Sequence, residues 1–153
     1  MDLVLWRHAH AEDGAPGGDD LARALTPKGI QQARRMGAWL DRQLPASARV
    51  LCSPAVRTVQ TAEALGRSFH TRATLAPDAS PMDLRQLVNW PQAGGVTLVV
   101  GHQPTLGQVV AQLVGLQDAE CPVKKGAVWW LRHRVRNGVA QTVVVTVQSP
   151  DLI

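Results

Sequence analysis

Short apolar runs alternate along the chain with longer segments in which apolar residues recur at helical intervals. Runs that are apolar at nearly every position are typical of strands buried on both faces of a sheet. The predicted strands are residues 3–6, 49–52, 96–100, 127–132 and 139–147, with a weaker extended segment at 73–75. Asn137-Gly138 predicts a tight hairpin turn between the last two strands.

Serine or threonine followed by proline marks three predicted helix starts: Thr26-Pro27, Ser53-Pro54 and Ser80-Pro81. The hydroxyl can accept from a free N–H of the first turn, and proline suits the first helical position. The first helix is predicted to continue to residue 44, the second through residue 65 and the third to residue 90. A fourth helix is predicted over residues 104–116.

Strands that alternate with capped helices predict an α/β fold, a three-layer sandwich with a mostly parallel central sheet flanked by helices. Residues 1–153 are expected to form a single domain, because no linker, repeat or low-complexity tract interrupts them. No apolar stretch approaches the roughly 20 residues of a membrane helix, and the N-terminus lacks the features of a signal peptide. We therefore expect a soluble, cytoplasmic protein.

The charge distribution changes this interpretation little. A formal net charge of +4 suits an acidic or phosphorylated partner. The basic residues are scattered, and the alternating Arg132, Arg134 and Arg136 are more typical of a solvated strand face than of a nucleic-acid site. No nucleic-acid or membrane partner is expected.

Two arginines and two histidines follow predicted strands. Arg7 and His8 come after the first strand, Arg57 lies in the first turns of the helix after the second, and His102 follows the strand 96–100. Side chains at the carboxyl ends of parallel strands share one edge of the sheet. A neutral imidazole is a nucleophile near pH 7, and guanidinium groups bind phosphoryl oxygens through paired donors. The sequence thus predicts a phosphoryl site.

His8 and His10 are spaced as a pair that could also chelate a metal ion. No cysteine or carboxylate arrangement supplies the third and fourth ligands of a tetrahedral site. Neither a metal nor another cofactor is expected.

These residues resemble the histidine phosphatase superfamily, which has the phosphoglycerate mutase-like fold. The matching segments are Arg7-His8 and residues 25–29, 53–62 and 101–104, in the order of the family. The short chain is similar to the SixA branch of phosphohistidine phosphatases, which lacks a large cap. The resemblance implies that His8 accepts the phosphoryl group while Arg7, Arg57 and His102 bind its oxygens. Ala9 departs from the family pattern, which usually has glycine there.

Larger family members carry a general acid between the second helix and the strand before His102. Here that interval contains only Glu63, Asp78 and Asp83 as acids, and none is an evident proton donor. An oxygen leaving group gains about 10²–10⁴-fold from such an acid, whereas an imidazole leaving group hardly requires one. This difference favours phosphohistidine as the substrate.

Our hypothesis is a phosphohistidine phosphatase that works through a phosphohistidine intermediate on the enzyme. Its partner would be a phosphohistidine-bearing protein, such as a histidine-containing phosphotransfer protein. Two alternatives stay open. One is a phosphomonoesterase for small metabolites with Asp78 or Asp83 as the acid, and the other is a phosphate-binding module without turnover.

Overall fold

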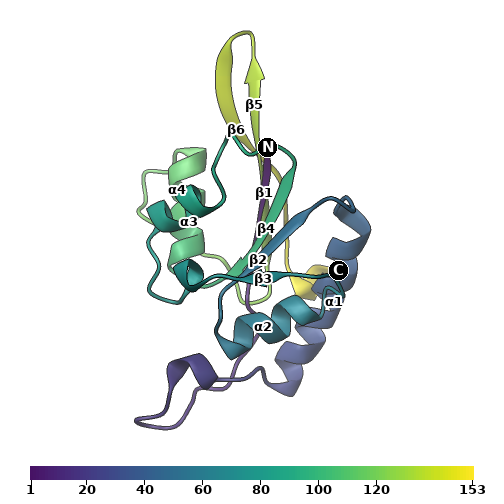
Figure 1. Cartoon of the computed structure of the whole chain (residues 1–153), viewed down its shortest axis with the longest axis vertical. Coiled ribbons are helices and arrows are strands. Elements are labelled where there is room, and N and C mark those ends of the chain that lie inside the picture. The colour runs from purple at the N-terminus through teal and green to yellow at the C-terminus, as the bar shows by residue number, and fades with distance from the viewer.

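The computed structural model describes residues 1–153 and contains one six-stranded sheet in the order β3-β2-β4-β1-β5-β6 (Figure 1). The strands are β1 (Asp2–Arg7), β2 (Arg49–Cys52), β3 (His70–Thr71), β4 (Val96–Gly101), β5 (Val128–Arg136) and β6 (Val139–Gln148). β4 pairs in parallel with β1 and β2, and β2 pairs in parallel with β3. β5 is antiparallel to both β1 and β6. The predicted mostly parallel α/β sheet is confirmed.

Helices cover both faces of the sheet, which gives the predicted three layers (Figure 1). They are α1 (Pro27–Gln43), α2 (Val56–Glu63), α3 (Pro81–Leu87) and α4 (Thr105–Val114), with short 3-10 turns η1 (Asp20–Ala22), η2 (Ala73–Leu75) and η3 (Pro150–Leu152). α1 and α2 pack on one face, and α3 and α4 pack on the other. None of these helices combines the length and the apolar character needed to cross a membrane.

Two of the three predicted helix caps are confirmed. The Thr26 hydroxyl accepts from the N–H of Gly29 at the start of α1. Ser80 and Asp83 form a capping box at the start of α3, in which each side chain accepts from the backbone N–H of the other residue. The carboxylate of Asp83 is thus engaged in capping.

The third predicted cap is wrong. α2 begins at Val56 with Ala55 at the N-cap position and has no side-chain cap. The Ser53 hydroxyl instead accepts from the N–H of Ala55, in a turn that precedes the helix. Arg57 still falls in the first turn of α2, as predicted.

The extended segment predicted at residues 73–75 is also wrong, because these residues form η2. The edge strand β3 lies earlier, where His70 pairs with Leu51 and Thr71 pairs with Cys52. β2 ends at Cys52, so later residues have no strand beside them. The chain turns there and buries Leu75 in the core.

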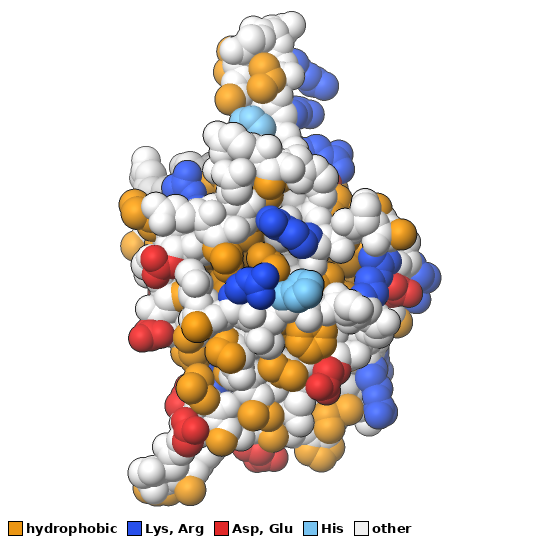
Figure 2. All heavy atoms as spheres, in the orientation of Figure 1, with side chains coloured by type: hydrophobic (Ala, Val, Ile, Leu, Met, Phe, Trp, Pro, Cys, Tyr) orange, Lys and Arg blue, Asp and Glu red, His pale blue; other side chains and the backbone are white.

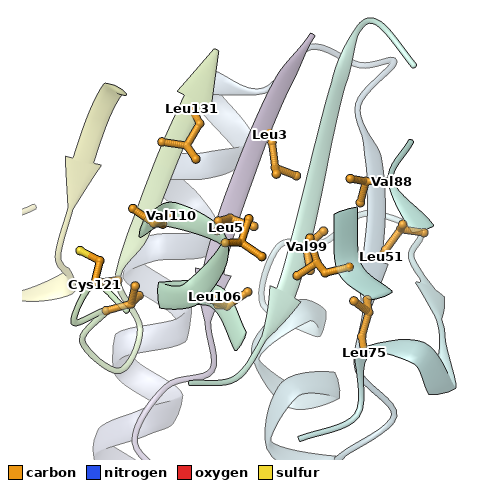
Figure 3. Close-up of a cluster of buried hydrophobic side chains, with 14 residues drawn as sticks. Leu3, Leu5, Leu51, Leu75, Val88, Val99, Leu106, Val110, Cys121 and Leu131 are labelled. Carbon is orange, nitrogen blue, oxygen red and sulfur yellow. The ribbon is translucent and has the colours of Figure 1, made fainter. Parts of the chain in front are cut away.

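The core consists of two apolar layers separated by the sheet. Alternate residues of β1 point to opposite faces, as the pleat requires. Leu3 and Leu5 pack with α3 and α4 (Figure 3), whereas Val4 and Trp6 pack with α1 and α2. All four side chains are buried, so β1 is fixed in the centre of the molecule. Its carboxyl end, where Arg7 and His8 lie, is held equally firmly.

The β5–β6 hairpin extends beyond the three layers (Figure 1). Asn137 and Gly138 both have positive φ angles, of 53° and 75°, as a two-residue hairpin turn of the predicted type requires. β5 is longer than predicted and ends at Arg136. Arginine side chains line one side of the projecting hairpin (Figure 2).

Candidate active site

The carboxyl ends of β1, β2 and β4 lie at one edge of the sheet, and backbone hydrogen bonds join the segments that follow them. The His8 N–H donates to Gly101 O and the Ser53 N–H donates to Val100 O, each at 3.1 Å. β1 ends at Arg7, so the chain turns at His8. In a continuing strand, the side chains of Arg7 and His8 would point to opposite faces of the sheet. The turn allows both to reach the same site.

The imidazole of His8 is held in one orientation by the backbone. Its Nδ1 lies 2.8 Å from the carbonyl oxygen of Ala9, and the side chain is buried. A carbonyl can only accept, so Nδ1 carries the proton and Nε2 keeps its lone pair. The nitrogen that could act as a nucleophile is therefore Nε2.

Ala9, the departure from the family pattern, fits without disturbing this turn. It is fully buried in a small apolar cluster with Ala11, Leu25 and Ala33. Its N–H donates to the Thr61 hydroxyl of α2 at 3.1 Å. The extra methyl group is thus packed behind the site and not in it.

His102 lies beside His8, with 5.3 Å between the two ring centroids. Its Nε2 is 2.8 Å from the Ser53 hydroxyl, which also accepts from the Ala55 N–H. With one lone pair so occupied, the Ser53 hydroxyl can donate its proton to Nε2. When Ser53 donates in this way, the proton of a neutral His102 resides on Nδ1, which is buried and has no hydrogen-bond partner. In that tautomer, the N–H of His102 Nδ1 is free to bind a ligand.

Both arginines are anchored at one end of the guanidinium group. Arg57 donates from Nη1 to the backbone oxygen of Asp20 at 2.8 Å and from Nη2 to the Asp20 carboxylate at 3.1 Å. Arg7 donates from Nη1 to Val123 O at 2.8 Å. The Nε atoms of both arginines are buried without a hydrogen-bond partner. Each such unpaired donor costs about 1–3 kcal/mol, and a bound anion would remove that cost.

The four predicted residues are brought within electrostatic range of one another. Burial, together with the positive charges of Arg57 and Arg7, lowers the pKa of His8 to about 4. Burial lowers the pKa of His102 to about 3, with contributions from Arg57, His8 and Arg7. Burial and the charge of Arg57 also lower the pKa of Arg7. At neutral pH the site therefore holds two uncharged imidazoles and two guanidinium cations.

A pH dependence of stability follows from the lowered pKa of His8. An imidazole in the unfolded chain titrates near 6.5, whereas folded His8 titrates at about 4. Below pH 6.5 the unfolded chain takes up a proton that the folded protein does not, so the free energy of unfolding falls as the pH falls through this window. Well above pH 6.5 both states are neutral and the effect disappears.

We expect His8→Asn to remove part of this acid sensitivity. Between pH 7 and pH 5 the variant should lose about 2 kcal/mol less free energy of unfolding than the wild type. Urea unfolding at the two pH values measures the difference, with His70→Asn, at an exposed position, as the control. Equal losses in wild type and His8→Asn would show that His8 is not held neutral by burial.

The carboxylate of Asp20 is a component of the site that sequence reasoning missed. Asp20 comes from the loop after His8 and lies outside the interval between α2 and β4, where larger family members carry their general acid. Glu63 lies on α2, and Asp78 and Asp83 lie just before and within α3. The available signal was an aspartate-rich loop directly connected to the strand that carries Arg7 and His8.

The histidines at positions 8 and 10 do not form part of a larger ligand group. His10 Nδ1 lies 2.7 Å from the Thr26 hydroxyl, at the start of α1. No cluster of three or more His, Cys, Asp or Glu side chains is arranged to hold a metal ion. The contact that the side chain of His10 makes is with Thr26, the residue that caps α1.

A sheet of this order, with paired imidazoles and guanidinium groups at its carboxyl edge, is the arrangement expected of an enzyme that handles phosphoryl groups. The sequence profile of the histidine phosphatase superfamily (branch 1) matches residues 3–92. The phosphohistidine phosphatase SixA of Escherichia coli is 32% identical over 123 residues, which cover 74% of each chain. The chain belongs to the histidine phosphatase superfamily and is a phosphatase of the SixA type.

Solved structures show the same fold. The protein histidine phosphatase SixA complexed with tungstate has a TM-score of 0.77 at 26% identity, covering 99% of this chain and 98% of that one. A phosphoserine phosphatase from Entamoeba histolytica, in complex with phosphoserine, has a TM-score of 0.71 at 15% identity and covers 99% of both chains. The second similarity concerns the fold alone.

Proposed function

We propose that this protein is a phosphohistidine phosphatase that removes the phosphoryl group from a phosphohistidine side chain of a protein. A histidine-containing phosphotransfer protein is the partner class we propose. The likeness to the Escherichia coli phosphohistidine phosphatase supports the proposal, as does the chemistry of the site.

The reaction has two displacement steps at phosphorus. The lone pair of His8 Nε2 forms a bond to phosphorus as the P–N bond of the substrate breaks. The electron pair of the broken bond stays on the substrate imidazole, whose other ring nitrogen already carries a proton, so the imidazole leaves uncharged. Water then attacks the phosphorylated His8. The second P–N bond breaks, the electron pair returns to Nε2, and inorganic phosphate leaves. His8 ends in its starting state.

The remaining side chains stabilise charge on the transferred group. During transfer, negative charge is spread over the three non-reacting oxygens of the phosphoryl group. Arg7 Nε, Arg57 Nε and His102 Nδ1 are buried donors whose hydrogen bonds are unfilled. Donors fixed before the reaction stabilise such charge without having to reorganise. In this mechanism they bind the oxygens while His8 attacks.

The choice of substrate rests on the surroundings of the two carboxylates nearest the site, Asp20 and Glu120. Hydrogen bonds from Arg23 and Arg57 lower the pKa of Asp20, so it is ionised at neutral pH. Glu120 is exposed and accepts from the side chain of Gln103. Neither lies in the apolar enclosure that a stored proton requires. A substrate whose leaving group needs no acid, such as phosphohistidine, suits this site.

The surroundings of Arg7 suit a substrate that is itself a protein. An open groove of about 500 Å³ lies directly beside this arginine. Its lining is formed by Arg7, Gln103, Glu120, Pro122, Val123 and Lys124. A groove of this kind leaves room for the surface around a phosphorylated side chain.

A comparison of substrates tests this proposal. We expect kcat/KM for a phosphohistidine-bearing phosphotransfer protein to exceed that for phosphoserine peptides and sugar phosphates by about 10²-fold or more, because only the esters need a general acid. Phosphate release under identical conditions is the measurement. Glu120→Gln serves as the matched variant, since it removes the acid of the groove and should not affect turnover of phosphohistidine.

Two outcomes would overturn the proposal. Faster turnover of the esters, particularly if Glu120→Gln, Asp78→Asn or Asp83→Asn abolished it, would identify a phosphomonoesterase. Phosphate binding without release from any substrate would identify a binding module.

A further inference from the structure

Asp20 contacts Arg57 through two different oxygens. Its backbone oxygen accepts from Nη1 at 2.8 Å, and its carboxylate accepts from Nη2 at 3.1 Å. A planar guanidinium group offers two edges that can each bind a pair of oxygens, one between the two Nη atoms and one between Nε and Nη2. Asp20 thus fills the edge between the Nη atoms by itself.

The other edge of Arg57 is the one left for a ligand. Nε is buried and has no hydrogen-bond partner in the protein. Arg7 is arranged in the same way, since its Nη1 is held by Val123 O while its Nε is free. In both arginines the protein occupies an Nη atom and leaves the buried Nε atom without a partner. The anchor of Arg57 differs in that it includes a charged side chain.

Asp20 is itself held in place. Its second carboxylate oxygen accepts from Arg23 Nε at 2.9 Å, and Arg23 also donates from Nη1 to Glu12 O at 2.7 Å. Asp19 caps η1 by accepting from the N–H of Leu21. An otherwise exposed loop is therefore tied to a buried arginine through one carboxylate that bridges two guanidinium groups.

We propose that Asp20 is a positioning residue that fixes the guanidinium group of Arg57 so that its Nε and Nη2 edge faces the phosphoryl oxygens. This inference rests on the proposed function, because it concerns how the same site binds the phosphoryl group. Asp20 acts through Arg57 and does not transfer a proton. Without the carboxylate, Arg57 is held by Nη1 alone and can rotate away from the productive orientation.

A purely electrostatic role for Asp20 would have the opposite consequence. A carboxylate beside an anion site repels the ligand, so its removal by itself strengthens oxyanion binding. If Asp20 instead positions Arg57, removal of its carboxylate weakens oxyanion binding. A neutral acceptor of the same shape then restores that binding. The sign of the effect therefore separates the two roles.

The test compares Asp20→Ala with Asp20→Asn. Tungstate affinity is measured by isothermal titration calorimetry, and kcat and KM are measured with a phosphohistidine protein. We expect Asp20→Ala to weaken tungstate binding about 10-fold and to lower kcat/KM by about 10–10²-fold, as misplacement of a binding group does. Asp20→Asn, whose amide oxygen can still accept from Nη2, should stay within about 3-fold of the wild type.

The charge-matched control is Asp19→Asn, which removes a neighbouring negative charge but keeps the cap of η1. It should leave tungstate affinity and kcat/KM unchanged. Tighter tungstate binding by Asp20→Ala, or loss of activity in Asp20→Asn equal to that in Asp20→Ala, would overturn the proposal. Failure of the wild type to bind tungstate would instead contradict the proposed phosphoryl site, so the two failures are distinguishable.

Discussion

Replacement of His8 by asparagine is expected to lower phosphatase turnover by about 10⁴-fold or more, the size of effect seen when a covalent nucleophile is removed. The asparagine can still donate to Ala9 O in place of Nδ1, so the turn after β1 keeps its hydrogen bond. What is lost is the Nε2 lone pair, which nothing else in the site replaces. The effect should therefore appear in kcat without unfolding the protein.

The same variant should fail to form a covalent intermediate. Incubation of the wild type with a labelled phosphodonor, followed by quenching, should yield an adduct that is labile in acid and stable in alkali, as a phosphorylated histidine is. The adduct should be present in His70→Asn, which alters an exposed histidine on the edge strand β3. An adduct of equal yield in His8→Asn would show that another residue is the nucleophile.

The second large effect is expected for Arg57→Lys, which should lower kcat/KM by about 10²–10³-fold, the cost of losing a fixed donor to transition-state charge. Lysine keeps the positive charge but cannot donate to Asp20 and to a phosphoryl group through two opposite edges. Arg57 is buried, so a flexible ammonium group there also loses its fixed position. Steady-state kinetics with a phosphohistidine protein measure the effect.

Arg34→Lys is the matched control, because this arginine is exposed on α1. It should leave kcat/KM unchanged. If kcat/KM of Arg57→Lys changed by less than about 3-fold, the positive charge alone would account for the effect of this residue, because lysine supplies the same charge.

Local sequence signals predicted most of the secondary structure because their physical causes are local. Thr26 and Ser80 cap helices through hydroxyl groups only a few atoms away, and Asn137-Gly138 has the backbone freedom that its turn requires. Ser53 has the same local pattern but does not cap α2. Its hydroxyl bonds His102, which is 49 residues away, and no local rule includes that partner.

The grouping of four side chains at one edge of the sheet was predicted for a related reason. The apolar runs identified the strands, and the residues that directly follow parallel strands share one edge of the sheet, so Arg7, His8, Arg57 and His102 could be grouped before any contact was known. Asp20 could not be placed in this way, because it lies in an irregular loop whose path is set by its contacts with Arg23 and Arg57.

The amino-acid sequence predicts the α/β class, most of the strands and helices, and the grouping of four residues at one edge of the sheet, because these depend on periodicity, capping and strand order. Tertiary contacts place the proton of His8 on Nδ1, leave particular arginine donors without a partner, and bring the carboxylate of Asp20 to Arg57. Those properties depend on burial and on partners distant in the chain, such as Ser53 for His102 and Asp20 for Arg57. The order of residues along the chain does not show which distant residues come into contact.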